Sequence, residues 1–362
     1  MNYLLRNMIL AIFLFVGMQA YPQEANQPAQ PEKEKSLDVT ELIMDHVADA
    51  YEWHITTFGQ TQISIPLPVI VKGKDSGWQV FSSSRFEHGA TYQGFCIAPE
   101  GNNKGKIVEK DASGEEIRPW DISITKNACS LMLSSALLII LILSCARWYK
   151  RRKEKPEEIS PKGFIGMMEM LIMSIVNDVV KPCIGKNYSR YTPYLLTVFF
   201  FIFFNNLLGI IPIFPGGANV TGNIAITAVL AVFTFIIVNI YGKKEYWKEI
   251  FWPDVPIWLK IPPIMPAIEL VGVFTKPFAL MIRLFANILA GHSIVLGLTC
   301  MIFLTVSLGA AMNTGMTVLS IVMTVFIDFV ELLVAFIQAY VFTMLSAVFI
   351  GLSQVEPHHV KN

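Results

Sequence analysis

The sequence predicts an all-α polytopic membrane protein that carries a small β-rich region near its N-terminus. Of its 362 residues, 53% are hydrophobic and only 15% are charged, whereas soluble globular chains carry about 25% charged residues. Several apolar stretches also reach the roughly 20 residues that a helix needs to cross a bilayer. Finally, clusters of Lys and Arg separate these stretches, as expected for cytoplasmic loops between membrane spans.

The N-terminus has the parts of a secretory signal peptide, which we assign to residues 1–20. Arg6 supplies a positive charge, an apolar run of about 11 residues follows, and Ala20 is a candidate cleavage point. An uncleaved signal anchor stays open, because Met18 stands where a small residue is usual. Residues 21–37 are rich in Pro, Gln, Glu and Lys and predict a flexible linker.

Residues 38–127 are predicted to form an exported region. Its first part, residues 38–56, has apolar positions at helical spacing and predicts a helix. The rest contains short β-type runs, QISIPLPVIV, WQVFSSS, TYQGFCIA and KIVEKD, separated by turn-forming residues. The stretch GNNKGK at 101–106 predicts a hairpin turn, because it lacks the spacing of a phosphate-binding loop.

The membrane domain is predicted to occupy residues 128–362 and to contain five transmembrane helices. The spans lie near 129–146, 194–213, 223–241, 267–308 and 317–352. Basic segments after the first and third spans indicate cytoplasmic loops by the positive-inside rule, which makes the N-terminal region exported and the C-terminus cytoplasmic. Residues 163–180 predict one interfacial amphipathic helix, because polar residues interrupt their apolar surface.

The last two spans are the arms of a long antiparallel hairpin. Each arm exceeds about 35 residues, so we expect both to be steeply tilted or kinked in the bilayer. The segment GAAMNTGM at 309–316 predicts the turn between them, on the outer side of the membrane. The sequence shows no internal repeat that would indicate the two matching halves of a transporter.

Ionisable residues inside these arms are candidates for function, because a charge at the bilayer centre costs about 2.5–3.5 kcal/mol. The first arm carries Glu269, Lys276, Arg283 and His292, and the second carries Asp328 and Glu331, with the uncharged but strongly polar Gln338 in addition. Residues at one depth of a hairpin are equally far from its turn, so Arg283 should face Gln338, and His292 should face Glu331. A purely structural role, in which these groups neutralise one another, is the alternative.

The order of these groups predicts a proton path that is interrupted in its middle. Imidazole titrates near neutral pH, so His292 with Glu331 can exchange protons on the outside, and Glu269 is a candidate for the inside. Arg283 cannot take part, because guanidinium stays protonated. A second component must therefore carry the proton past Arg283, and a mobile carboxylate fits this role.

Several of these motifs, in order, resemble subunit a of the F-type ATP synthase. The resemblance covers about residues 129–352 and rests on RLFANILAG, TKPFALMI, FFNNLLGIIP, PAIELVGVFTKP and the segment from FVELL to VFIGL. By these motifs, residues Arg283, Asn287, Gln338, Asn206 and Glu269 match functional positions of the family. His292 and Glu331 are exchanged between the arms relative to many bacterial members, and the exported segment 21–127 lies outside the shared core.

The resemblance implies two offset aqueous half-channels that bring protons to and from the carboxylates of a rotating c-ring. The outside half-channel would contain Asn206, Asn287, His292, Glu331 and Gln338; the inside one would contain Glu269, and Arg283 would separate them. The implied partners are the c-ring, the peripheral stalk b subunits and the rest of the ATP synthase complex, in a bacterial inner membrane. The ring would largely set whether H⁺ or Na⁺ is the coupling ion.

Two other functions remain as alternatives. A stand-alone proton-coupled secondary transporter or ion channel would need a substrate site at broken helices and usually two related halves. A structural membrane anchor would leave the two polar layers of the hairpin unexplained. We predict no cofactor and no metal site, because the five cysteines stand singly, and a net charge of zero gives no indication of nucleic-acid binding.

Overall fold

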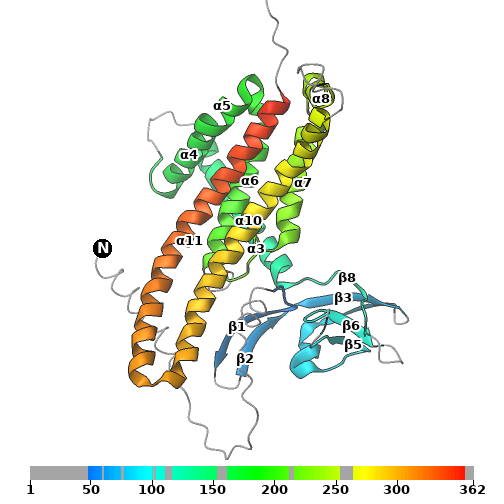
Figure 1. Cartoon of the computed structure of the whole chain (residues 1–362), viewed down its shortest axis with the longest axis vertical. Helices are drawn as coiled ribbons and strands as arrows, with labels where there is room; N and C mark the ends of the chain where they lie inside the picture. The colour runs from blue at the N-terminus through cyan, green and yellow to red at the C-terminus, as the bar shows by residue number, and fades with distance from the viewer. Residues whose placement is uncertain are drawn as a thin grey trace, which may run out of the picture. The chain divides into compact units, whose positions relative to one another are not determined.

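A computed structural model describes residues 48–354, apart from 59–60, 75–76, 100, 102, 111–115, 153–160, 212–215 and 253–263. The predicted signal peptide and linker lie outside the described residues, as does the first part of the predicted helix 38–56. Within the described part, a β-rich region comes first in the chain and is followed by long helices (Figure 1). The predicted fold class is therefore confirmed.

The β-rich region contains three small antiparallel sheets. Its strands are β1 (Glu52–Phe58), β2 (Thr61–Pro66), β3 (Pro68–Gly73), β4 (Gly77–Ser82), β5 (Phe95–Ile97), β6 (Ile107–Lys110), β7 (Glu116–Ile117) and β8 (Trp120–Asp121). β1 pairs with β2, and the other sheets have the orders β4–β3–β8 and β5–β6–β7. The predicted β-type runs and the predicted hairpin turn at 101–106 are confirmed, since this turn joins β5 to β6.

The helix predicted for 38–56 is wrong over residues 52–56, which belong to β1. They pair with residues 63–66 of β2 in the antiparallel ladder, with an irregularity between His54 and Thr56. A helical pattern over so short a window is a weak signal. Hydrogen bonding to a neighbouring strand outweighs it here.

Buried and exposed side chains alternate along β3, and this alternation shows which face of the β4–β3–β8 sheet is covered. Val69 and Val71 are fully buried, and they belong to one cluster with Phe95 and Ile107 of the β5–β6–β7 sheet. The intervening residues of β3 point to the opposite face, as the two-residue period of a strand requires. The two three-stranded sheets thus share one core.

The membrane domain consists of helices that match the predicted spans. They are α3 (Lys126–Arg152), α4 (Phe164–Ser174), α5 (Lys181–Ile184), α6 (Tyr188–Ile210), α7 (Ile224–Ile240), α8 (Lys244–Phe251), α10 (Ile264–Leu304) and α11 (Ala310–Ser353). Within the described residues, four stretches are long and apolar enough to cross a membrane. The pair α7 and α8, bent by 99° at their junction, gives a fifth. The chain is thus a multi-pass membrane protein.

The predicted interfacial helix corresponds to α4 and its continuation, the π-helix Ile175–Val180. Its position at a membrane surface stays a prediction. After α5, Gly185 adopts a φ of 72°, which glycine tolerates much better than other residues. The chain then enters α6, the second predicted span.

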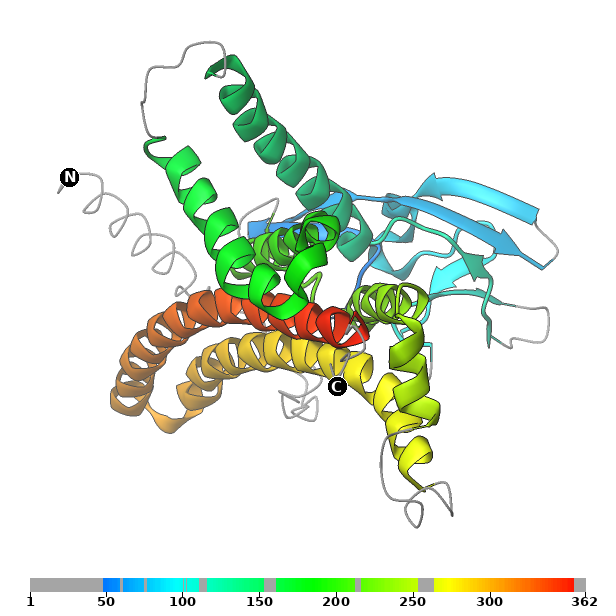
Figure 2. The same ribbon diagram turned by 90° about the horizontal axis from the view of Figure 1, so that it is seen from above.

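The two arms of the hairpin are α10 and α11, with 41 and 44 residues. Both are bowed and run beside each other (Figure 2). The turn predicted at 309–316 is wrong in its length, because α11 already begins at Ala310. Only the short 3-10 helix Thr305–Leu308 and Gly309, with a φ of 100°, interrupt the two helices. The Asn313 side chain accepts a hydrogen bond from Thr305, so this turn-type residue stabilises the start of α11.

α6 packs against α11 in the centre of the helical domain. Leu195, Phe199 and Ile202 of α6 are fully buried, as are Ala339 and Ala347 of α11. Small side chains allow helix backbones to approach closely in a membrane. This packing sets the orientation of α11 and therefore the direction in which its polar residues point.

Candidate functional site

Arg283 and Gln338 meet across the hairpin, as their distance from the turn predicts. The side-chain amide of Gln338 donates a hydrogen bond to the backbone carbonyl of Arg283 at 2.8 Å. Gln338 is buried, whereas the Arg283 side chain is exposed. Among the described residues, no carboxylate forms an ion pair with its guanidinium. The structure thus leaves a permanent cation on the outer surface of an apolar helix.

His292 and Glu331 form the second layer. The His292 Nδ1 and Glu331 Oε1 atoms lie 3.9 Å apart, and both side chains are half-buried. Gly291 permits this approach, because a Cβ atom at its position would overlap Oε1 of Glu331. Asp328, one turn before Glu331 on α11, adds a second negative charge that acts on Glu331. The predicted pairing is therefore confirmed.

Asn206 of α6 holds a third polar position beside this layer. Its buried side chain accepts a hydrogen bond from the Thr221 hydroxyl at 2.7 Å and donates one to the Ala335 carbonyl at 3.3 Å. These bonds connect α6 to α11 and to the segment before α7. The amide is therefore fixed next to the His292–Glu331 pair.

A cavity of about 20 Å³ joins these polar groups, and we name it the outer cavity. Its lining includes Asn206, Asn219, Thr221, Asn287, His292 and Glu331. Its volume is enough for at least one water molecule, which needs about 10–15 Å³ and several polar partners. The structure thus brings four residues from the predicted outer path around one polar space.

Asn219 and Thr221 line this cavity although neither was among the predicted site residues. Both precede α7 in the segment ANVTGN, and Asn219 accepts a hydrogen bond from the Gly222 backbone at 2.8 Å. The Nδ2 atom of Asn219 is buried and has no hydrogen-bond partner among the described residues. A water molecule in the outer cavity would satisfy this donor. The sequence feature that could have identified them is this Asn–x–Thr pair, which follows soon after the polar end of the second predicted span.

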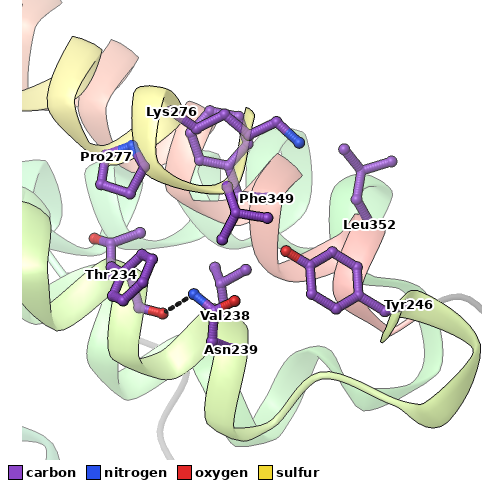
Figure 3. A pocket seen from close by; sticks show the side chains of 10 residues that line it. Thr234, Val238, Asn239, Tyr246, Lys276, Pro277, Phe349 and Leu352 are labelled. Carbon is purple, nitrogen blue, oxygen red and sulfur yellow. Dashed lines mark hydrogen bonds between the residues drawn. The ribbon is translucent and has the colours of Figure 1, made fainter. Parts of the chain in front are cut away.

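A second cavity of about 20 Å³, the inner cavity, lies beside the part of α10 that separates Glu269 from Arg283. Figure 3 shows Thr234 and Asn239 of α7, Tyr246 of α8 and Lys276 of α10 around it. Asn239 donates to the Phe235 carbonyl at 2.7 Å, but its buried Oδ1 atom has no partner among the described residues. This acceptor also suits a water molecule.

Glu269 does not line the inner cavity, although it was the residue predicted for the inner path. It lies near enough to Tyr246, which does line the cavity, for the two to interact electrostatically. Lys276 stands between Glu269 and Arg283 at seven-residue intervals, and residues spaced in this way lie on similar faces of a helix. Its ammonium nitrogen is 5.9 Å from the centre of the Phe349 ring. Sequence reasoning missed Asn239 and Tyr246.

The sequence matches two family models and many known proteins. Residues 131–351 match the family described as ATP synthase A chain, and residues 42–124 match a domain of unknown function, DUF8433. The chain is 42% identical over 246 residues to ATP synthase subunit a of Chlorobium phaeobacteroides (strain DSM 266), which covers 66% of this chain and 68% of the relative.

Two further relatives match over similar lengths. ATP synthase subunit a 2 of Chlorobaculum tepidum is 44% identical over 247 residues, which cover 66% of this chain and 65% of the relative. ATP synthase subunit a of Chloroherpeton thalassium is 38% identical over 251 residues, which cover 67% of this chain and 70% of the relative. The chain thus spans about two thirds of each relative. The family match over residues 131–351 includes all seven predicted site residues. We conclude that this chain belongs to the ATP synthase A chain family, whose members are the subunits a.

Proposed function

We propose that this chain forms the stationary proton path of an ATP synthase, and that Arg283 is its central barrier. One observation carries the proposal: an exposed arginine without an ion-pair partner among the described residues stands on α10 between two small cavities, each lined in part by polar groups. A permanent charge in an apolar helix is costly, so a partner outside this chain is expected to compensate it. Family membership gives no support to the alternative of a stand-alone transporter.

The outer cavity would carry protons between the outside and the middle of the membrane. His292 and Glu331 supply the exchangeable sites, and the amides of Asn206 and Asn287 supply hydrogen-bonding groups for water. Gln338 fixes the two arms to each other at the level of Arg283, just beyond this cavity. The pair and the bound water would form the outer half of the path.

Arg283 would stop this path from continuing through the chain. A carboxylate on a moving partner would be attracted to the guanidinium and would lose its proton there. The face of α10 beside Arg283 also carries exposed apolar residues such as Phe278 and Ile282, which suit a partner helix in the membrane. Transfer of one charge across the bilayer releases about 2.3 kcal/mol per 100 mV. This energy would drive the partner past the arginine.

The inner half of the path would run from Arg283 toward Glu269. The inner cavity lies along this stretch, and the amide of Asn239 and the hydroxyl of Tyr246 offer water-binding groups there. Glu269 would then exchange protons with the second aqueous side. Because α10 carries Arg283 between the two halves, no continuous chain of titrating groups connects them.

The partners follow from this arrangement. The moving carboxylate would belong to a ring of small c subunits, and b subunits of the peripheral stalk would hold this chain stationary. By the positive-inside rule, the basic residues around the end of α3 and those at Lys243, Lys244 and Lys248 would lie on the cytoplasmic side of a bacterial inner membrane. The β-rich region would then be exported.

Substitution of Arg283 tests the proposal. In inverted membrane vesicles, Arg283→Ala should abolish ATP-driven proton pumping, because the barrier cation is lost. The matched control is Arg190→Ala, which removes an exposed arginine of α6 that lies 4.7 Å from the Tyr241 ring. This control should keep pumping, and co-purified c subunits should show that both variants assemble. Pumping by assembled Arg283→Ala complexes would contradict the proposal.

A further inference from the structure

The β4–β3–β8 sheet has one face that no described residue covers. We name it the outer sheet face and define it by Ile70, Lys72, Trp78, Val80, Trp120 and Ile122. Trp78, Val80, Trp120 and Ile122 are 54%, 69%, 76% and 60% exposed. Lys72 is paired with Trp78 on one neighbouring strand and with Trp120 on the other. Two indoles therefore flank one lysine on an otherwise apolar surface.

The opposite face of this sheet is already occupied. Val69 and Val71 are completely buried in the core shared with Phe95 and Ile107. An exposed apolar patch of this kind usually marks an interaction surface. The outer sheet face is the one available for such an interaction.

This sheet is joined almost directly to the first membrane-spanning helix. The backbone amides of Ile122 and Ile124 donate to the carbonyls of Ile70 and Pro68 at 3.0 and 3.1 Å, which extends the pairing of β8 with β3. α3 begins at Lys126, only four residues after Ile122. Four extended residues span at most about 14 Å. The outer sheet face therefore cannot lie far from the membrane surface.

Contacts at the start of α3 make this connection stiff. The Asp49 carboxylate accepts a hydrogen bond from the Asn127 backbone at 3.0 Å, and Thr125 accepts one from Ala128 at 3.4 Å. These bonds satisfy amides of the first helical turn. Buried Trp53 of β1 also packs with Ala218 and Val220 before α7. The β-rich region is thus attached to two helices.

We propose that the outer sheet face lies on the lipid headgroup region of the membrane that α3 crosses. Tryptophan is enriched at membrane–water interfaces, because its indole combines an apolar body with a polar N–H group. Lysine suits the same depth, since its stem is apolar and its ammonium group reaches phosphate and water. The face is also continuous with α3, whose apolar Met132 and Ile140 side chains are 63% and 61% exposed. The sheet would hold the β-rich region against the bilayer next to the helices.

Photo-crosslinking in the assembled complex tests this contact. A photoreactive phenylalanine is placed at Val80 or Trp120, and the complex is reconstituted in nanodiscs of phosphatidylethanolamine with phosphatidylglycerol. The matched control carries the same group at Glu116, an exposed residue of β7 in the other sheet. Because all three positions are exposed, the probe should not disturb packing, and ATP-driven pumping verifies the fold.

The expected result is a phospholipid adduct at positions 80 and 120, at a yield several-fold above that at position 116. Adducts to a second copy of this chain or to another subunit would assign the face to a protein and overturn the proposal. Equal lipid yields at all three positions would overturn it as well. The measurement detects lipid directly, so its outcome is independent of the role proposed for Arg283.

Discussion

The imidazole of His292 faces the carboxylate of Glu331 at 3.9 Å across the two arms of the α10–α11 hairpin. The pair borders the outer cavity, which Asn206 and Asn287 also line. A proton acceptor and a proton donor thus share a space that can hold water. We predict that the arms are interchangeable for this purpose, provided that both groups reach the same depth.

Exchange of the two residues tests whether depth is sufficient. His292→Glu alone places two carboxylates together, and Glu331→His alone places two imidazoles together. Each single change should lower ATP-driven proton pumping by roughly 10²-fold, the usual contribution of a positioned acid–base group. The double variant His292→Glu with Glu331→His restores one group of each kind and should recover most of the lost rate. A double variant no faster than the singles would show that the position of each group on its own arm is essential.

Gly291 is predicted to be required for the approach of Glu331. In Gly291→Ala the new methyl group would overlap Glu331 Oε1, so the carboxylate must move away from His292. We expect slower pumping with little change in stability, because the group that must shift is the end of a flexible side chain. Gly297→Ala on the same helix is the control, because a Cβ there meets nothing within 4 Å. Equal pumping rates of the two variants, measured in vesicles with equal subunit content, would contradict this role.

The hydrogen bond from Tyr51 to Asp121 predicts a pH dependence of the β-rich region. Burial of the phenol, and then its bond to the Asp121 carboxylate, raise the pKa of Tyr51 above its ordinary value. A raised pKa in the folded state means that the stabilisation is complete below the ordinary tyrosine pKa of about 10 and is lost as the pH rises through the folded-state pKa. The region should therefore loosen only in strongly alkaline solution.

The variant Tyr51→Phe separates this effect from other titrations. It should cost roughly 1.5–3 kcal/mol, the range for hydrogen bonds to charged groups, and its stability should no longer decrease through ionisation of this phenol. Limited proteolysis of the β-rich region as a function of pH measures both. Identical alkaline profiles for the wild type and Tyr51→Phe would argue against the assignment.

Much of the membrane domain follows from the sequence, because hydropathy and basic loops depend on position along the chain alone. The helices α3, α6, α7, α10 and α11 lie where apolar length predicts spans. The two polar layers follow for the same reason, since depth in an antiparallel hairpin depends only on distance from the turn. The predicted turn was several residues too long, but this error did not change which residues face each other. The sequence midpoints of the Arg283–Gln338 and His292–Glu331 pairs both lie near Gly309, where the chain reverses.

Other features depend on contacts between distant segments, which the sequence pattern does not indicate. Residues 52–56 form β1 and not a helix, because β2 offers them backbone partners. Asn219 and Thr221 reach the outer cavity only because the segment before α7 folds back against α6.

The sequence alone therefore predicted the long apolar helices, the hairpin and the pairing of its polar groups, since these properties are one-dimensional. Only the folded chain shows that Gln338 is buried while Arg283 is exposed, and that one face of β3 is covered while Lys72 lies open between two tryptophans. These differences depend on rotation about a helix axis and on which surfaces pack together. Both are decided by side-chain packing between segments that are distant in the chain.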